Sequence, residues 1–181
     1  MYRDNSLIPI EAVRLCALGR LLQGSLSYAA LAGEVRHFTS RMMGPSLDLL
    51  GTSIELLRLE GLVAAEGGKG MDDNAMLAIT DAGRAQFRDL MRAHVRAPGS
   101  DVGKLVLALK LRFLHLLALE DRREQMDQMV ELYQGEKARL VDLRRGLTRD
   151  ESSEHLAKWL DLEIEQIDQR LAWFEGFQAQ K

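Results

Sequence analysis

Residues 47–80 read LDLLGTSIELLRLEGLVAAEGGKGMDDNAMLAIT, and this stretch decides the fold that the sequence predicts. Its first part has apolar side chains at spacings of three and four, the pattern of a helix with one face on a core. These side chains are Leu47, Leu50, Ile54 and Leu57. Gly61 suits the left-handed residue that ends a helix, so the pattern predicts a helix over about 46–60.

The second part of the stretch predicts a β-hairpin and the start of another helix. Residues 62–66 form an extended run, glycines follow at the expected tip, and residues 76–79 return. Thr80 offers a hydroxyl to cap a helix that begins near Asp81. A helix followed by a two-stranded hairpin is the core of a winged helix, which presents the outward face of that helix to DNA.

Two further helices are expected before this stretch. Pro9 suits the first turn of a helix that runs to about Gln23, and Ser27, at the end of an expected turn, suits the cap of the second. The end of the second helix and the loop after it gather a small polar and basic cluster. Its members are Arg36, His37, Thr39, Ser40 and Arg41.

The sequence changes character at residues 97–100, which read APGS. We expect a winged helix-turn-helix domain over 1–97 and a helical domain over 101–181. Residues 105–117 are apolar on more than one face, as in a buried helix, here one between two subunits. The last helix has a narrow apolar stripe typical of coiled coils. The stripe consists of Leu156, Leu160, Ile164, Ile167, Leu171 and Phe174.

The predicted fold class follows from these elements. It is mostly α with a small two- or three-stranded β wing, in which an N-terminal winged helix-turn-helix precedes long C-terminal helices. Two long helices with narrow apolar seams bury themselves poorly in a monomer, so the C-terminal part is expected to form a homodimer.

Composition and charge restrict the class of protein. The formal net charge is −3, and residues 1–90 hold nine Lys and Arg against eleven Asp and Glu. DNA binding would therefore depend on a local basic face. No apolar run approaches the roughly 18 residues that span a bilayer, and the first residues lack the pattern of a signal peptide. The single cysteine, Cys16, fits a buried position in a reducing cytoplasm.

No catalytic, metal or cofactor site is expected. The four histidines lack the spacing of metal ligands, and the glycines of the hairpin tip lack the lysine–hydroxyl pair of a phosphate-binding loop. The many acidic residues of the C-terminal helices are most simply a solvated face, because no pair has the context of acid–base catalysis.

Four segments together form a recognisable pattern: 18–24, 27–32, 50–63 and, most specifically, 79–84, which reads ITDAGR. These segments resemble the PadR family of bacterial transcriptional regulators, and its AphA-like branch in particular. Residues 109–113 and 160–174 are similar to that family's dimerisation helices. The resemblance covers nearly the whole chain and implies a dimeric winged-helix activator or repressor with antiparallel C-terminal helices.

The predicted DNA-binding residues lie on and around the helix over 46–60. Ser46 at its N-terminus can meet phosphate, and Thr52 and Ser53 face outward on it. The full set is Arg36, Thr39, Ser40, Arg41, Ser46, Thr52, Ser53 and Lys69. In the alternative interpretation Ser46 is only a cap and the others form a solvated face. The predicted dimerisation residues are Leu109, Phe113, Leu116 and the six members of the stripe.

Two departures from the family's pattern keep a second function open. The family's aromatic residue in the recognition helix is Gly51 here, and the wing has one lysine, Lys69, against Asp72 and Asp73. The second function is that of a winged-helix dimer that has lost DNA binding and acts by protein contact or ligand sensing. The expected partners are double-stranded DNA, a second copy of the chain and an unidentified small-molecule effector.

Overall fold

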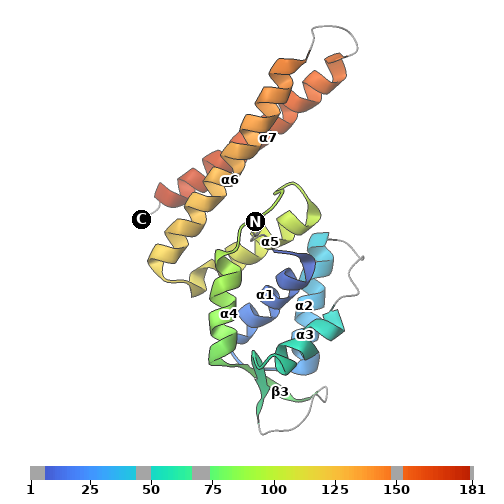
Figure 1. Ribbon diagram of the computed structural model, residues 1–181, viewed down its shortest axis with the longest axis vertical. Helices are drawn as coiled ribbons and strands as arrows, with labels where there is room; N and C mark the ends of the chain where they lie inside the picture. Colours follow the sequence, from blue (N-terminus) through green and yellow to red (C-terminus); the bar gives the residue numbers. More distant parts are fainter. Residues whose placement is uncertain (1–6, 44–49, 67–73, 148–152, 180–181) are drawn as a thin grey trace, which may run out of the picture. The chain divides into compact units, whose positions relative to one another are not determined.

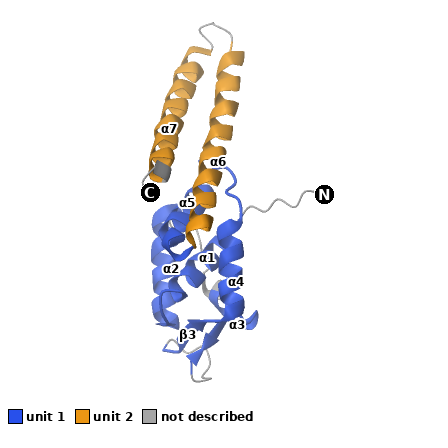
Figure 2. Ribbon diagram, turned by 90° about the vertical axis from the view of Figure 1, so that its left-hand side faces the viewer, with its two compact units in different colours: residues 1–117 blue, residues 118–181 orange. Residues whose placement is uncertain are grey.

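The computed structural model describes residues 7–43, 50–66, 74–147 and 153–179. The chain forms two compact units, which Figure 2 distinguishes by colour. Unit 1 consists of residues 1–117 and unit 2 of residues 118–181.

The described residues of unit 1 form five α-helices and a small sheet. Its helices are α1 (Pro9–Leu21), α2 (Tyr28–Met43), α3 (Leu50–Leu59), α4 (Asp81–Arg92) and α5 (Asp101–Phe113), followed by the 3-10 turn η2 (Leu114–Leu116). Its strands are β1 (Leu26–Ser27), β2 (Val63–Ala65) and β3 (Met76–Ile79). Figure 1 shows the other helices of the unit gathered around α1. The described part of the chain therefore has the predicted order of helix, wing and helix.

The first helix, α1, is the centre of unit 1, and α2, α3, α4 and α5 all pack against it. Pro9 stands in its first turn, and the backbone N–H of Ile8 donates to the Glu11 carboxylate at 2.9 Å. Gly19 permits the approach of α5, because a Cβ there would lie 2.5 Å from the ring of Phe113. A helix surrounded on all sides needs apolar residues around its whole circumference, as α1 has.

The sheet is antiparallel with the strand order β1-β3-β2. Leu26 pairs with Leu77, and Val63 pairs with Ile79. Residues 24–27 were expected as a turn, but Leu26 and Ser27 form the third strand of the wing. Ser27 also has its predicted role, because its hydroxyl accepts the Ala30 N–H at 3.2 Å at the start of α2.

The joint between α3 and the wing confirms the predicted stop and cap. Gly61 has a φ of 72°, and the Leu62 N–H donates to the Leu57 carbonyl at 2.8 Å, which closes the helix. The Thr80 hydroxyl accepts the Gly83 N–H at 3.1 Å and donates to the Gly61 carbonyl at 2.7 Å. One side chain therefore joins the end of α3 to the start of α4.

Unit 2 is a hairpin of two long helices, α6 (Leu119–Gly146) and α7 (Glu154–Ala179), which pack against each other. The rings of Tyr133 and Phe174 stack across them with centroids 5.5 Å apart. The Lys137 ammonium lies 2.5 Å from the Asp168 carboxylate, and a second ion pair joins Arg144 and Asp161 at 2.8 Å. Exposed ion pairs of this kind stabilise a hairpin only weakly.

The place of α5 differs from the expectation. Residues 105–117 were expected to begin a C-terminal domain and to lie between two subunits, but α5 packs against α1 and α2 inside unit 1. Leu109 and Phe113 are fully buried there, and Leu116 packs against the same core. These residues are therefore covered by their own chain, and the compact units divide after Leu117 rather than at 97–101.

Candidate nucleic-acid interface

The two helices α2 and α3 form the helix-turn-helix part of unit 1. Ile54 and Leu57 of α3 are fully buried, as their spacing predicted, so the opposite side of this helix faces outward. Its described outward residues include Glu55, Arg58 and Leu59, of which Leu59 is 75% exposed. The described outward side of α3 thus carries an acidic, a basic and an apolar side chain.

The predicted basic residues of α2 are both exposed, but they do not form one cluster. Arg36 and Arg41 are five residues apart, which turns their side chains about 140° from each other around the helix. Arg36 shares its face with Ser40, whose hydroxyl donates to the His37 carbonyl at 3.2 Å. A duplex could therefore meet Arg36 and Ser40 together, whereas Arg41 lies on another face of α2.

The structure corrects the assignment of Thr39. Its side chain is 1% exposed, and its hydroxyl donates to the Val35 carbonyl at 2.9 Å, within α2 itself. Threonine in a helix often bonds the carbonyl one turn earlier in this way. Thr39 therefore belongs to the packing of α2 and has no surface to offer to DNA.

Of the four other predicted DNA-binding residues, two lie in α3. Thr52 and Ser53 lie in the first turns of α3, which begins at Leu50 in the structure. Ser46 and Lys69 lie outside the described residues.

A bidentate ion pair fixes the end of α3 against α1. The two terminal nitrogens of Arg14 donate to the two carboxylate oxygens of Glu60 at 2.8 and 2.5 Å. Arg14 is largely shielded, and the fork-to-fork geometry determines both distance and orientation. The pair therefore sets where α3 ends relative to the central helix.

A second group of charges holds α2 between α1 and α5. The Arg20 guanidinium donates to the Glu34 carboxylate, and this hydrogen bond lowers the pKa of Glu34. Arg112 of α5 lies 4.0 Å from the same carboxylate and places its guanidinium 4.7 Å from the centre of the Phe38 ring. The position of α2 thus depends on side chains from both neighbouring helices.

Two ionisable groups are buried in unit 1 and do not contribute to its surface. Lys110 is 1% exposed and its ammonium donates to the Met91 carbonyl, in the last turn of α4; burial lowers its pKa to about 7. Burial also raises the pKa of Cys16 to about 12, so this thiol remains protonated and unreactive, as its expected buried position implies.

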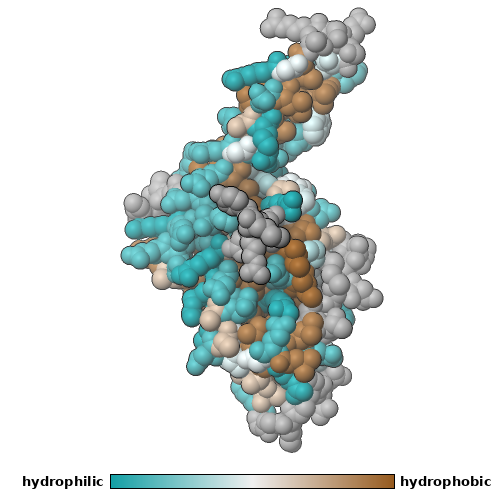
Figure 3. Space-filling view, viewed as in Figure 1, coloured by the Kyte–Doolittle hydropathy of each residue, from teal (hydrophilic) through white to brown (hydrophobic). Residues whose placement is uncertain are grey.

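The predicted dimerisation stripe of α7 faces inward for most of its length. Leu160, Ile167, Leu171 and Phe174 are buried, Ile164 is half-buried, and only Leu156 is clearly exposed. The exposed large apolar side chains of α7 lie mostly on a different face. They are Trp159, Leu162, Trp173 and Phe177. Figure 3 shows apolar surface on the α6–α7 hairpin near the end that joins the two helices.

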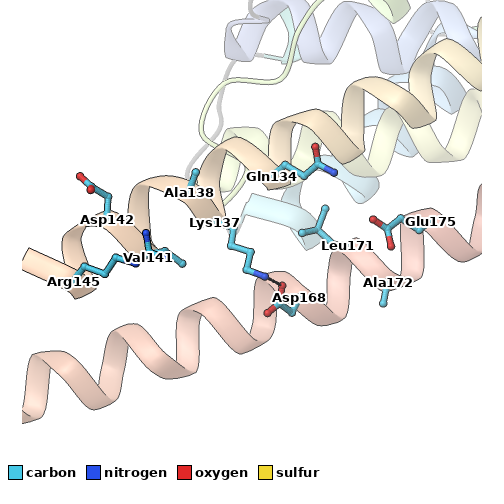
Figure 4. A pocket seen from close by; sticks show the side chains of 10 residues that line it. All are labelled: Gln134, Lys137, Ala138, Val141, Asp142, Arg145, Asp168, Leu171, Ala172 and Glu175. Atoms are coloured by element: carbon cyan, nitrogen blue, oxygen red, sulfur yellow. Dashed lines mark ion pairs between the residues drawn. The ribbon is translucent and has the colours of Figure 1, made fainter.

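A hollow of about 630 Å³ lies between α6 and α7. Figure 4 shows its lining, where the side chain of Lys137 reaches across to Asp168. Its apolar floor includes Val141 and Leu171, and its rim carries charges of both signs, including Arg145 and Glu175. The hollow is open to solvent along one side of the hairpin.

The described residues contain no group of three or more His, Cys, Asp or Glu side chains that could hold a metal ion. No helix in the described ranges is both long enough and apolar enough to cross a bilayer.

Comparison with known proteins identifies the family. The model of the AphA-like transcriptional regulator matches residues 2–178. The structure of Bacillus subtilis PadR with p-coumaric acid is 16% identical with a TM-score of 0.39, over 93% of this chain and 97% of that chain. The structure of the same protein with operator DNA is 16% identical with a TM-score of 0.37, over 96% and 100% of the two chains. No curated protein matches.

The match with the family model spans both compact units. The segment that carried the most specific resemblance, residues 79–84, also has a physical basis in the structure. Thr80 caps α4, and Gly83 lies so close to the Leu62 carbonyl that a side chain would not fit. The chain belongs to the family of AphA-like transcriptional regulators, which are not enzymes.

Proposed function

We propose that the protein is a homodimeric regulator that places α3 of each copy in the major groove of double-stranded DNA in the cytoplasm. The observation that carries this proposal is the helix-turn-helix and wing of unit 1 in a chain of a family of transcriptional regulators. In a symmetric dimer the two recognition helices would enter grooves about one helical turn, roughly 34 Å, apart.

The proposed contacts divide into two classes. Arg36 and Ser40 on one face of α2, with Ser46 and Lys69, would contact phosphates and so fix the position of the protein on the duplex, and Arg41 would contact a phosphate from another face of the helix. Thr52 and Ser53 in the first turns of α3 would meet base edges or phosphates. Because few cations are involved, the affinity should be modest and should fall with rising salt.

The homodimer is supported by the apolar side chains that unit 2 leaves exposed. Seven of the ten exposed large apolar side chains among the described residues belong to unit 2, which comprises only residues 118–181. Several of them, including Trp159 and Trp173, lie on α7, and large exposed apolar side chains gathered on one element often mark an interaction site. The interface would use the outer face of α7 in place of the buried residues Leu109 and Phe113.

A small-molecule effector is the remaining proposed partner. The PadR structure with p-coumaric acid concerns a relative of low identity, and the chemistry of a ligand for this chain would be set by its own residues. The hollow between α6 and α7, with an apolar floor and a charged rim, is one place of suitable size.

The DNA-binding proposal is tested with the DNA upstream of the protein's own gene. Retention is measured at two salt concentrations for the natural chain and for Arg36→Ala, which should weaken binding and reduce the salt slope by about one. Arg123→Ala, an exposed arginine of α6, is the matched control and should bind like the natural chain. Absence of salt-dependent retention, or an equal loss in both variants, contradicts the proposal.

A second function is favoured by one feature of α3. Its described surface carries the exposed carboxylates of Glu55 and, just past its end, Glu60, the latter in the ion pair with Arg14. Negative charge beside a recognition helix weakens attraction to phosphate. A dimer that fails to bind any duplex at low salt would support action by protein contact or ligand sensing.

A further inference from the structure

The side of α4 that faces solvent carries a row of arginines. Arg84, Arg88 and Arg92 follow one another at intervals of four residues, and all three are exposed. Residues four positions apart share one face of a helix. On the opposite side of α4, Phe87 and Leu90 are buried in the core of unit 1. The row therefore points away from the body of the unit.

The positive charge of this row is only partly balanced by its neighbours. Residues 81–96 hold four arginines against two aspartates, Asp81 and Asp89. The Arg84 guanidinium lies 4.0 Å from the Asp81 carboxylate, and its side chain is still 48% exposed. An exposed ion pair of this kind is weak and leaves the cation available to another anion. By contrast, residues 54–59 of α3 hold one arginine against one glutamate.

The arginine row continues toward the end of α3. The Arg84 N–H donates to the Thr80 carbonyl at 2.9 Å, so Thr80 lies one turn before Arg84 on the same face. Thr80 and Arg58, a residue of the last turn of α3, line one hollow of about 490 Å³. The rest of its lining is Leu59, Gly61, Val63, Ala64 and Ala65. Figure 1 shows α4 rising from the wing, so the hollow has a cation of α3 at one border and the foot of the row at another.

The floor of this hollow brings the protein backbone close to the surface. It follows β2, which lies at the edge of the described sheet. Gly61 and Ala64 are exposed there, and neither has a side chain long enough to cover the backbone. Backbone N–H groups on the free side of an edge strand can donate to phosphate oxygens. The hollow and the row together therefore offer both charged and backbone donors to an anion.

We propose that the hollow at β2 and the arginine row of α4, together called the flank surface, bind the phosphate backbone of duplex DNA just outside the site that α3 reads. The inference rests on the proposed DNA binding and adds a contact that does not depend on base sequence. It also supplies the local basic face that a chain of net charge −3 needs in order to attract a duplex.

The spacing of the arginines favours DNA over an acidic protein surface. Four helical residues rise about 6 Å, so the guanidinium groups recur at about this interval. The phosphates of one strand advance about 3.4 Å per nucleotide along the duplex axis, so every second phosphate recurs after about 7 Å. Guanidinium groups also bind phosphate oxygens through two parallel hydrogen bonds. A folded acidic protein has no such regular repeat of negative charge.

The test compares two duplexes centred on the segment, upstream of the protein's own gene, that the natural chain protects from nuclease. The short duplex has about 20 base pairs, enough for two half-sites one helical turn apart. The long duplex has about 10 further base pairs, one helical turn, at each end. Fluorescence anisotropy measures the affinity of each at several salt concentrations.

The variant that removes the row is the double substitution Arg84→Gln with Arg88→Gln, which deletes two charges from exposed positions of α4. The natural chain should bind the long duplex about tenfold more tightly than the short one, because additional phosphates are neutralised. The double variant should lose this gain, and its salt slope on the long duplex should fall by about one for each lost phosphate contact. Its affinity for the short duplex should stay unchanged.

The matched control is Arg123→Gln with Arg139→Gln, which deletes the same charge from exposed positions of α6. The control should keep the gain from the longer duplex, and so should the natural chain when the sequence of the added base pairs is changed. An equal loss in both double variants, or an equal weakening on both duplex lengths by the α4 variant, overturns the inference.

The outcomes also separate this inference from the proposed function. Binding of the short duplex with no gain from the added base pairs overturns the flank surface as a DNA contact and leaves the proposed function intact. In that case an acidic protein becomes the partner to test for the arginine row. A natural chain that protects no segment and binds neither duplex at low salt overturns both.

Discussion

Units 1 and 2 differ in how completely they cover their apolar side chains. Unit 1 surrounds α1 with four helices and a sheet, and its core residues are almost completely buried. Unit 2 has only two helices, so each helix has one covered face and leaves apolar residues such as Trp159 and Trp173 exposed. The comparison teaches that unit 1 is complete as a single chain, whereas unit 2 is expected to gain much of its stability from association.

The largest expected effect comes from removing a side chain from the core of unit 1. Phe113→Ala should lower the free energy of unfolding by about 3–5 kcal/mol, because the ring fills the space beside Gly19 and contacts Phe87. Denaturant unfolding measures this. Leu162→Ala in unit 2 is the contrasting control and should cost under about 1 kcal/mol in dilute protein. A loss of unfolding free energy for Phe113→Ala as small as that for Leu162→Ala would contradict the difference between the two units.

The next effect concerns the exposed face of unit 2. Replacing Trp159 and Trp173 together by alanine should raise the dimer dissociation constant by about 100-fold or more, because buried tryptophans dominate interface energies. Sedimentation across a dilution series measures the constant. Leu143→Ala, exposed on α6, should leave it nearly unchanged. An unchanged constant in the double variant would remove the basis for assigning association to α7.

A third effect distinguishes the buried charge of unit 1 from the surface charges of unit 2. Since burial lowers the pKa of Lys110 from 10.5 to about 7, the unfolded lysine takes up a proton between these values that the folded lysine does not. Stability should therefore fall as the pH falls through this window, by about 2 kcal/mol over two pH units. Lys110→Met should lack this slope, and Lys137→Met should retain it; the same slope in all three chains would contradict the effect.

The smallest effect tests the joint between α3 and α4. Thr80→Ala removes the cap of α4 and the bond to the Gly61 carbonyl, and should cost about 1–2 kcal/mol. Thr80→Ser keeps the hydroxyl and should recover most of the loss, as measured by thermal unfolding. If serine fails to recover it, the methyl group and not the hydroxyl is what matters at this position.

The parts of the fold that depend on local patterns were predictable from the sequence. The inward stripe with Ile54 and Leu57, the stop at Gly61 and the cap at Thr80 each follow from residues within one or two helical turns. The strand Leu26–Ser27 was not predictable in this way, because two residues become a strand only by pairing with residues fifty positions away.

The errors concerned which surface covers an apolar residue. Periodicity indicated that α5 is buried on several sides, but it could not indicate whether its own chain or a second copy covers Leu109 and Phe113. On α7 the apolar stripe was identified, but two long helices were expected to bury such stripes poorly by themselves, whereas most of this one is buried within the single chain. The side chain of Thr39 is buried and its hydroxyl is bonded within α2, and neither fact could be predicted from the sequence pattern around it.

The double role of Thr80 has a mechanical consequence. Its hydroxyl is bonded at once to the carbonyl that ends one helix and to the amide that begins another. Any torque on α3, such as that from a duplex against its outer face, is therefore passed directly to the base of α4, and through it to α1. We therefore expect α3, α4 and α1 to move together as one rigid group, without a hinge between α3 and α4.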